Sequence, residues 1–143
     1  MSAISLAKTD PIRVLIADDH DQIRSSLSIF LEVFDDLELV GAAHNGQEAL
    51  KLCKELEPDI VLLDLLMPQM DGVAATREIR RIHPYTQVIV LTSFYDETIL
   101  HKALQAGASH YLLKDVTIDE LAAAIRSVHG QKLSNLPASA PIH

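Results

Sequence analysis

DIVLLD, at residues 59–64, is the stretch that decides the fold, because four consecutive apolar residues stand here between two aspartates. Uninterrupted runs of Val, Ile and Leu of this length are typical of strands that are covered on both faces, as in a parallel sheet. A charge at the end of such a run is costly unless it is paired or used for chemistry. Asp64 is therefore the first candidate for a functional residue.

Four other segments have the composition of strands, and helical patterns separate all five. We expect strands at 12–17, 37–43, 59–64, 87–93 and 110–113. Between and after them, apolar residues recur three or four positions apart, which predicts amphipathic helices. This alternation predicts an α/β fold with right-handed crossovers. The expected topology is flavodoxin-like: a doubly wound, five-stranded parallel sheet in the strand order 2-1-3-4-5, with helices on both faces.

Capping residues mark several helix ends in the sequence. Asn45 is a candidate N-cap for the second helix, and Thr117 with Glu120 forms a candidate capping box for the last one. Gly107 is a natural stop for the fourth helix. From Gly130 onward the helical period ends, and small, polar and proline residues follow. The segment 130–143 is therefore predicted to be a flexible tail or linker.

Length, charge and cysteine content restrict the class of protein. The 143 residues suit one domain, placed at 12–129 after an N-terminal extension at 1–11. The formal net charge of -8 argues against direct binding to DNA or to an anionic membrane. The one cysteine, Cys53, excludes a disulfide within the chain, and no apolar run reaches transmembrane length. We expect a cytoplasmic protein with no membrane partner.

Acidic residues follow two strands that the predicted topology makes neighbours. Asp18 and Asp19 follow the first strand, and Asp64 ends the third. In a parallel sheet these three carboxylates meet at one edge, where their repulsion calls for a cation. Oxygen ligands at an incompletely closed site suit Mg²⁺. Taken alone, Asp18 or Asp19 is equally well explained as a cap of the first helix.

The ends of the last two strands add a hydroxyl group and a positive charge. Thr92 and Ser93 close the fourth strand, and Lys114 follows the fifth. Alone, Thr92 is an ordinary strand residue and Lys114 an ordinary surface lysine. Together with the carboxylates they provide a nucleophile, a metal site, a hydrogen-bond donor and a fixed cation. That combination can hold a phosphoryl group.

Four motifs in this order resemble a known family. ADDH at 17–20, DLLMPQMDG at 64–72, LTS at 91–93 and YLLKD at 111–115 resemble the receiver domains of two-component response regulators. The resemblance covers roughly residues 12–129. YLLKD and the following AIRSVHG look like the subfamily that often carries a C-terminal helix-turn-helix.

The resemblance implies a role for each acidic residue. Asp64 would be the phosphoacceptor. Asp19 and Asp64 would bind Mg²⁺ directly, together with the backbone carbonyl of Leu66, and Asp18 would act mainly through metal-bound water. Mn²⁺ is the alternative ion, and no other cofactor is implied.

The resemblance also implies which residues would respond to phosphorylation. Thr92 would hydrogen-bond the phosphoryl oxygen and Lys114 would pair with it. Tyr111 would be the switch aromatic, moving inward as Thr92 moves toward the phosphate. Many receiver domains have a proline and a cis peptide after the lysine, whereas Asp115 stands here, so the geometry of the Lys114–Asp115 bond is open.

The implied partners follow from this switch. A sensor histidine kinase or a phosphotransfer protein would donate the phosphoryl group, and phosphorylation would favour a homodimer. DNA would be contacted only through a separate C-terminal domain outside this chain, in a transcription regulator. The protein would be no enzyme in the usual sense, because it promotes only its own phosphotransfer and dephosphorylation.

Two other functions fit parts of the sequence. Asp19-His20-Asp21 superficially resembles the DxD motif of haloacid-dehalogenase-like phosphatases, which use an aspartate nucleophile, but Ile23 stands where that family has Thr or Val. That assignment also gives Asp64 no role. A phosphate-independent interaction module is the second alternative; the presence of all five expected site residues argues against it.

Overall fold

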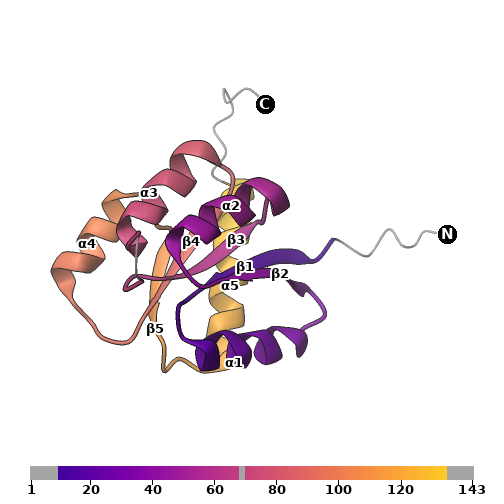
Figure 1. Cartoon of the computed structure of the whole chain (residues 1–143). Helices are drawn as coiled ribbons and strands as arrows, with labels where there is room; N and C mark the ends of the chain where they lie inside the picture. The colour runs from indigo at the N-terminus through magenta and orange to yellow at the C-terminus, as the bar shows by residue number, and fades with distance from the viewer. Residues whose placement is uncertain (1–9, 68–69, 135–143) are drawn as a thin grey trace.

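The computed structural model describes residues 10–67 and 70–134, in which strands and helices alternate (Figure 1). The strands are β1 (Ile12–Ala17), β2 (Leu37–Ala43), β3 (Ile60–Asp64), β4 (Gln87–Thr92) and β5 (His110–Leu113). The helices are α1 (Asp21–Glu32), α2 (Gly46–Leu56), α3 (Gly72–Ile82), α4 (Glu97–Gln105) and α5 (Ile118–Ser134).

The strands form one parallel sheet in the order β2-β1-β3-β4-β5, which confirms the predicted topology. The strand limits agree with the predicted ones except that β3 begins at Ile60 and β4 ends at Thr92. β1 and β3 are direct neighbours, and so are β3 and β4. The carboxyl ends of these three central strands therefore lie side by side.

Two apolar cores lie on opposite faces of the sheet. One packs side chains of β1, β3 and β4 against α2, α3 and α4, and the other packs the alternate side chains of the same strands against α1 and α5. Figure 1 shows the sheet between these two groups of helices. Burial on both faces explains why the central strands are continuous apolar runs rather than alternating ones.

Three apolar residues on the helix faces that pack against the sheet stay partly exposed. Phe30, Ile82 and Leu104 belong to the apolar stripes of their helices, yet their side chains are 38%, 49% and 44% exposed. The stripe of a helix is wider than the strip that a flat sheet can cover, so residues at its margin stay in contact with water. These three residues are therefore not part of the core.

The predicted helix caps are confirmed. Asn45 accepts a hydrogen bond from the Glu48 backbone N–H at 2.8 Å. Thr117 and Glu120 exchange the two side-chain to backbone hydrogen bonds of a capping box, at 2.9 and 3.0 Å. Gly107 follows α4 with a φ of 115°, a backbone conformation that glycine adopts without strain.

The last helix is longer than the sequence pattern indicated. α5 continues through Gly130 to Ser134, so the prediction that residues 130–134 belong to a tail is wrong. One glycine costs roughly 1 kcal/mol in a helix interior and does not by itself end the helix. The rest of the predicted tail, 135–143, and most of the predicted N-terminal extension, 1–9, lie outside the described residues.

Cys53 lies on the buried face of α2, and burial raises the pKa of its thiol to about 12. Reaction requires the thiolate, so this thiol is inert while the protein is folded. In the part of the chain that the structure describes, no helix has the length and apolar character needed to cross a membrane.

Candidate functional site

Most buried polar side chains of the described residues gather at one edge of the sheet. Asp18, Asp64 and Thr92 are only 2%, 3% and 4% exposed, and each stands at the carboxyl end of a central strand. The two other buried polar residues, Thr76 and Thr86, each donate their hydroxyl to a backbone carbonyl and need no further explanation. Asp18, Asp64 and Thr92 share one edge of the sheet, and the two buried carboxylates there call for a functional account.

Lys114 places its ammonium group between the two buried carboxylates. Its Nζ lies 2.7 Å from Asp18 Oδ2 and 3.3 Å from Asp64 Oδ2. The Lys114 side chain is 11% exposed, so water screens these pairs weakly. The sheet itself aims the lysine here, because the Lys114 backbone N–H donates to the Thr92 carbonyl at 2.8 Å and continues the pairing of β4 with β5.

A close backbone contact shapes the loop after β3. The Gly72 N–H donates to the Leu65 carbonyl at 2.9 Å. A Cβ atom on Gly72 would lie 2.6 Å from the Asp64 carbonyl oxygen, so only glycine fits at this position. The Leu66 N–H also donates to Asp64 Oδ1 at 3.2 Å. The hydrogen bond from Leu66 orients the carboxylate, and the Gly72 contact keeps the loop close to the end of β3.

Asp19 and His20 complete the acidic cluster on its outer side. The His20 Nδ1 atom lies 2.8 Å from Asp18 Oδ1, 3.2 Å from Asp19 Oδ1 and 3.9 Å from Asp64 Oδ2. The hydrogen bond with Asp18, followed by the charge of Asp19, raises the pKa of the imidazole. One ligand atom from each of these four residues lies within 4.8 Å of the others, which is a spacing that suits one cation.

Asp64 is the member of the cluster whose ionised form is disfavoured by its surroundings. Burial, followed by the charge of Asp18, raises the pKa of its carboxyl, while Leu66 and Lys114 oppose the rise. Its Oδ2 is buried and has no hydrogen-bond partner among the described residues, although Lys114 Nζ is nearby. An unsatisfied buried oxygen beside two further carboxylates fits the coordination of a hard divalent cation.

We expect Asp64→Asn to stabilise the metal-free protein. With a raised pKa, the carboxyl contributes stability below the ordinary aspartate pKa and loses it as the pH rises through the raised value. At neutral pH the variant should melt higher, because burial and the Asp18 charge disfavour the ionised carboxyl more than Lys114 and the Leu66 N–H favour it. Each 1 kcal/mol of relieved destabilisation corresponds to roughly 3–4 °C. The measurement is thermal unfolding with a chelator at neutral and at acidic pH, where the difference should shrink.

Asp36→Asn provides a control of opposite sign. Its hydrogen bonds with Arg126 lower the pKa of the Asp36 carboxyl, so the ionised form stabilises the folded protein. Removing this charge should lower the melting temperature slightly, because the pair is about half exposed. An Asp64→Asn protein that is no more stable than wild type at neutral pH would contradict the prediction that the ionised Asp64 carboxyl destabilises the fold.

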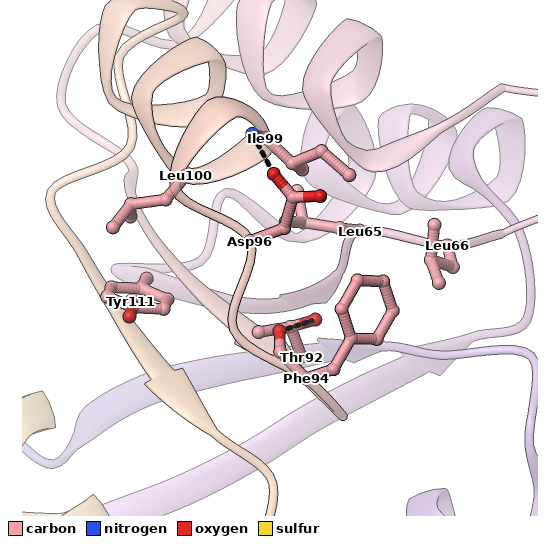
Figure 2. A pocket seen from close by; sticks show the side chains of 8 residues that line it. All are labelled: Leu65, Leu66, Thr92, Phe94, Asp96, Ile99, Leu100 and Tyr111. Atoms are coloured by element: carbon pink, nitrogen blue, oxygen red, sulfur yellow. Dashed lines mark hydrogen bonds between the residues drawn. The ribbon is translucent and has the colours of Figure 1, made fainter.

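Thr92 and Tyr111 line a small pocket between β4, β5 and α4 (Figure 2). The Thr92 hydroxyl donates to the Phe94 carbonyl at 3.2 Å, and the Tyr111 ring lies 6.0 Å from that of Tyr95. The pocket has a volume of only about 10 Å³, which is the space of one water molecule. Tyr111 cannot move inward unless Thr92 or α4 moves first. The rest of the lining is Leu65, Leu66, Phe94, Asp96, Ile99 and Leu100.

The structure brings together most of the residues that the sequence pointed to. Asp18, Asp19, Asp64 and Lys114 form one cluster, and Thr92 ends the adjoining strand. Tyr111 lines the same pocket as Thr92 and is not in the cluster itself, and its role as the switch aromatic stays a prediction. The Lys114–Asp115 peptide is trans, which answers the open question about this bond.

His20 is the residue to which the sequence analysis assigned no role. It is the N-cap residue of α1 without a side-chain capping hydrogen bond, and its Nδ1 atom contacts three carboxylates. The available signal was its place in ADDH directly after the first strand. The contacts themselves depend on Asp64, which is 44 positions away in the sequence and arrives only through the sheet.

Comparison with known proteins gives a consistent result. The family described as the response regulator receiver domain matches residues 14–126. The transcriptional regulatory protein LiaR of Bacillus subtilis (strain 168) is 46% identical over 116 residues, which are 81% of this chain and 55% of LiaR. The chain thus spans about half the length of the curated relatives it matches.

Two solved structures extend the similarity to three dimensions. A DNA-binding response regulator of the LuxR family from Staphylococcus aureus superposes with a TM-score of 0.78 at 32% identity, covering 82% of this chain and 98% of the other. A chain of the CheX-CheY-BeF3-Mg²⁺ complex from Borrelia burgdorferi gives a TM-score of 0.77 at 26% identity, covering 83% and 90%. Fold, motif order and sequence identity agree, and the chain therefore belongs to the response regulator receiver domain family of two-component systems.

Proposed function

We propose that this protein is a signalling switch that accepts a phosphoryl group on Asp64. The observation that carries the proposal is the buried Asp64 carboxylate, whose Oδ2 lacks a hydrogen bond while a lysine and two further carboxylates surround it. Such a group is costly in a purely structural role. The cost is explained if the carboxylate is kept reactive for phosphoryl transfer.

In the proposed reaction, a carboxylate oxygen of Asp64 attacks phosphorus and forms an acyl phosphate. The bond from phosphorus to the donor breaks, and its electron pair leaves with the donor group, which takes a proton from solvent. Lys114 Nζ, now 3.3 Å from Asp64 Oδ2, would neutralise charge on the transferred group. Thr92 would exchange its hydrogen bond with the Phe94 carbonyl for one to a phosphoryl oxygen.

The residues at this edge fit Mg²⁺, with Mn²⁺ as the alternative ion. We assign direct contacts to Asp19, Asp64 and the Leu66 carbonyl, and a contact through water to Asp18. A bound divalent ion would supply positive charge against the phosphoryl oxygens. The solved complex of the Borrelia burgdorferi relative contains Mg²⁺ and BeF3, which supports this chemistry for the family. The three carboxylates repel one another, so an ion should also stabilise the fold.

The test is phosphorylation by a small-molecule donor. Incubation with acetyl phosphate and Mg²⁺ should add one phosphoryl group per chain, detected as a mass increase of the intact protein. The modification should be lost on treatment with hydroxylamine, which cleaves acyl phosphates. A matched sample with a chelator in place of Mg²⁺ should stay unmodified. Equal labelling with and without the ion would contradict the proposed metal site.

The proposed partners follow from the family. A sensor histidine kinase or a phosphotransfer protein would be the natural donor. LiaR is a transcriptional regulatory protein, and the Staphylococcus aureus relative is a DNA-binding response regulator. We infer that this chain acts in the cytoplasm, with 12–129 as the receiver domain, and that DNA binding would belong to a separate C-terminal domain. Beyond its own phosphotransfer and dephosphorylation, we propose no enzymatic activity.

Phosphorylation should change self-association. As Thr92 moves toward the phosphoryl group, space for the Tyr111 ring opens beneath α4 and alters the surface of α4, β5 and α5. The α1–α5 surface is the second candidate, since Ile29 and Val33 are 62% and 61% exposed. Sedimentation velocity with and without beryllium fluoride should show a larger species only with the mimic.

Asp64→Asn is the control for this experiment, because it should not bind the mimic and should sediment identically in both conditions. A wild-type protein that stays monomeric at high concentration with beryllium fluoride would contradict homodimerisation. A partner protein would then be the reader of the switch.

A further inference from the structure

We propose that the His20 imidazole is an additional ligand of the metal site and shifts its preference from Mg²⁺ toward late first-row transition ions such as Co²⁺. The inference rests on the proposed function, because it concerns the ion that the Asp64 site would bind. It goes beyond that function because it assigns the metal selectivity to one side chain. A site built from carboxylate and carbonyl oxygens alone favours Mg²⁺, Ca²⁺ or Mn²⁺, whereas imidazole nitrogen favours the later ions.

The distances around His20 match a shared coordination sphere. Two ligand atoms about 2.1 Å from one ion lie about 3 Å apart at neighbouring octahedral positions and about 4.2 Å apart at opposite ones. His20 Nδ1 is 3.2 Å from Oδ1 of Asp19, a proposed direct ligand, and it is 2.8 Å from Oδ1 of Asp18, the residue assigned a contact through water. Its distance to Asp64 Oδ2 is 3.9 Å. The imidazole therefore stands where a ligand would stand, with its nitrogen turned toward the oxygens.

Asp64 supplies an independent sign that this space is made for a cation. Its side chain is 3% exposed, and its Oδ2 points to the cluster without a hydrogen bond from any described residue. Lys114 Nζ lies 3.3 Å from Oδ2 and is paired more closely with Asp18 Oδ2, at 2.7 Å. An ion held between Asp64 Oδ2 and His20 Nδ1 would give this oxygen a second positive partner.

Two ordinary roles of His20 explain its position less well. It is the N-cap residue of α1, but its side chain makes no capping hydrogen bond. An ion pair of the protonated imidazole with Asp18 and Asp19 would contribute little, since the His20 side chain is 58% exposed. Neither role accounts for the approach of the nitrogen to Asp64 Oδ2 at 3.9 Å. Because the backbone cap does not depend on the imidazole, His20→Ala should fold normally.

The test compares the affinities for two ions in matched variants. Isothermal titration calorimetry at one mildly alkaline pH gives the dissociation constants for Mg²⁺ and Co²⁺, and their ratio measures selectivity. In His20→Ala the preference for Co²⁺ should fall by about tenfold, the loss typical of one supporting ligand, with a smaller change for Mg²⁺. In proton NMR of the Co²⁺ form, the wild type should show a strongly shifted, exchangeable imidazole N–H that His20→Ala lacks.

His44→Ala is the matched control. His44 also follows a strand at this edge of the sheet, contacts a carboxylate (Glu48 Oε1 at 2.6 Å), and is 62% exposed. It lies outside the cluster of four, so its removal should leave both the selectivity ratio and the shifted resonance unchanged. If both ions share one site, excess Mg²⁺ should displace Co²⁺ and remove the shifted resonance.

The outcomes separate this inference from the proposed function. An unchanged ratio in His20→Ala, with Mg²⁺ still bound, would overturn the role of His20 and leave the Asp64 site intact. Tighter binding of both ions in His20→Ala would also overturn it, because the imidazole would then block the site. If the wild type binds neither ion, both the inference and the proposed metal site fail.

Discussion

We expect Asp64→Asn to abolish phosphorylation by acetyl phosphate. The amide has nearly the shape of the carboxylate but is not a nucleophile at neutral pH, so the loss should be complete within detection. The variant should remain folded, since it relieves the charge that burial and Asp18 make unfavourable. Intact-protein mass spectrometry over a time course with Mg²⁺ measures the effect, and melting of the same samples verifies folding.

Asp71→Asn is the matched control for this substitution. Asp71 follows the same strand, is exposed, and caps α3 by accepting a hydrogen bond from Ala74 N–H at 2.8 Å. Asparagine can accept the same bond, so the fold should be retained and phosphorylation should proceed at the wild-type rate. If Asp64→Asn gains a phosphoryl group as fast as this control, the phosphoacceptor is another residue.

The second large effect concerns the lifetime of the phosphorylated protein. Leu66 and Phe94 line the pocket beside Thr92, and their side chains are 51% and 43% exposed. Neither side chain can hydrogen-bond an attacking water, and Figure 2 shows Phe94 beside Thr92 in the pocket that Leu66 also lines. The acyl phosphate should therefore be long-lived. Leu66→Asn combined with Phe94→Glu should speed its hydrolysis on the order of tenfold or more by positioning a water molecule.

The measurement is the decay of the phosphorylated mass after the donor is removed by desalting. The control is Ile82→Asn combined with Leu104→Glu, which makes the same kinds of change at side chains that are 49% and 44% exposed on α3 and α4. This control should decay at the wild-type rate. If the Leu66 and Phe94 variant decays no faster than the control, the two apolar side chains do not protect the phosphoryl group.

The order of elements and the sheet topology were readable from the sequence. The runs at 14–17 and 60–63 are apolar throughout because their strands are covered on both faces, and this pattern can be read without knowing which elements pack against them. Capping side chains such as Asn45 and Thr117 also act within one turn of their own helix. Where the signal was weak, as at Gly130, the predicted helix end was wrong.

Membership of the site was predictable for the same reason. The residues of the cluster lie at the carboxyl ends of strands, and parallel strands bring these ends to one edge. They are Asp18, Asp19, Asp64, Thr92 and Lys114. The sequence alone therefore determined the fold and named the residues that meet there.

Only the tertiary structure decided the interactions at that edge. The position of Lys114 between Asp18 and Asp64, the bare Oδ2 of Asp64 and the triple contact of His20 depend on side chains from separate strands. Distances, burial and pKa shifts vary steeply over a few ångströms, whereas a sequence pattern records only which face or end of an element a residue occupies. The chain thus determined which residues meet, and packing determined which of them are paired, strained or free to bind an ion.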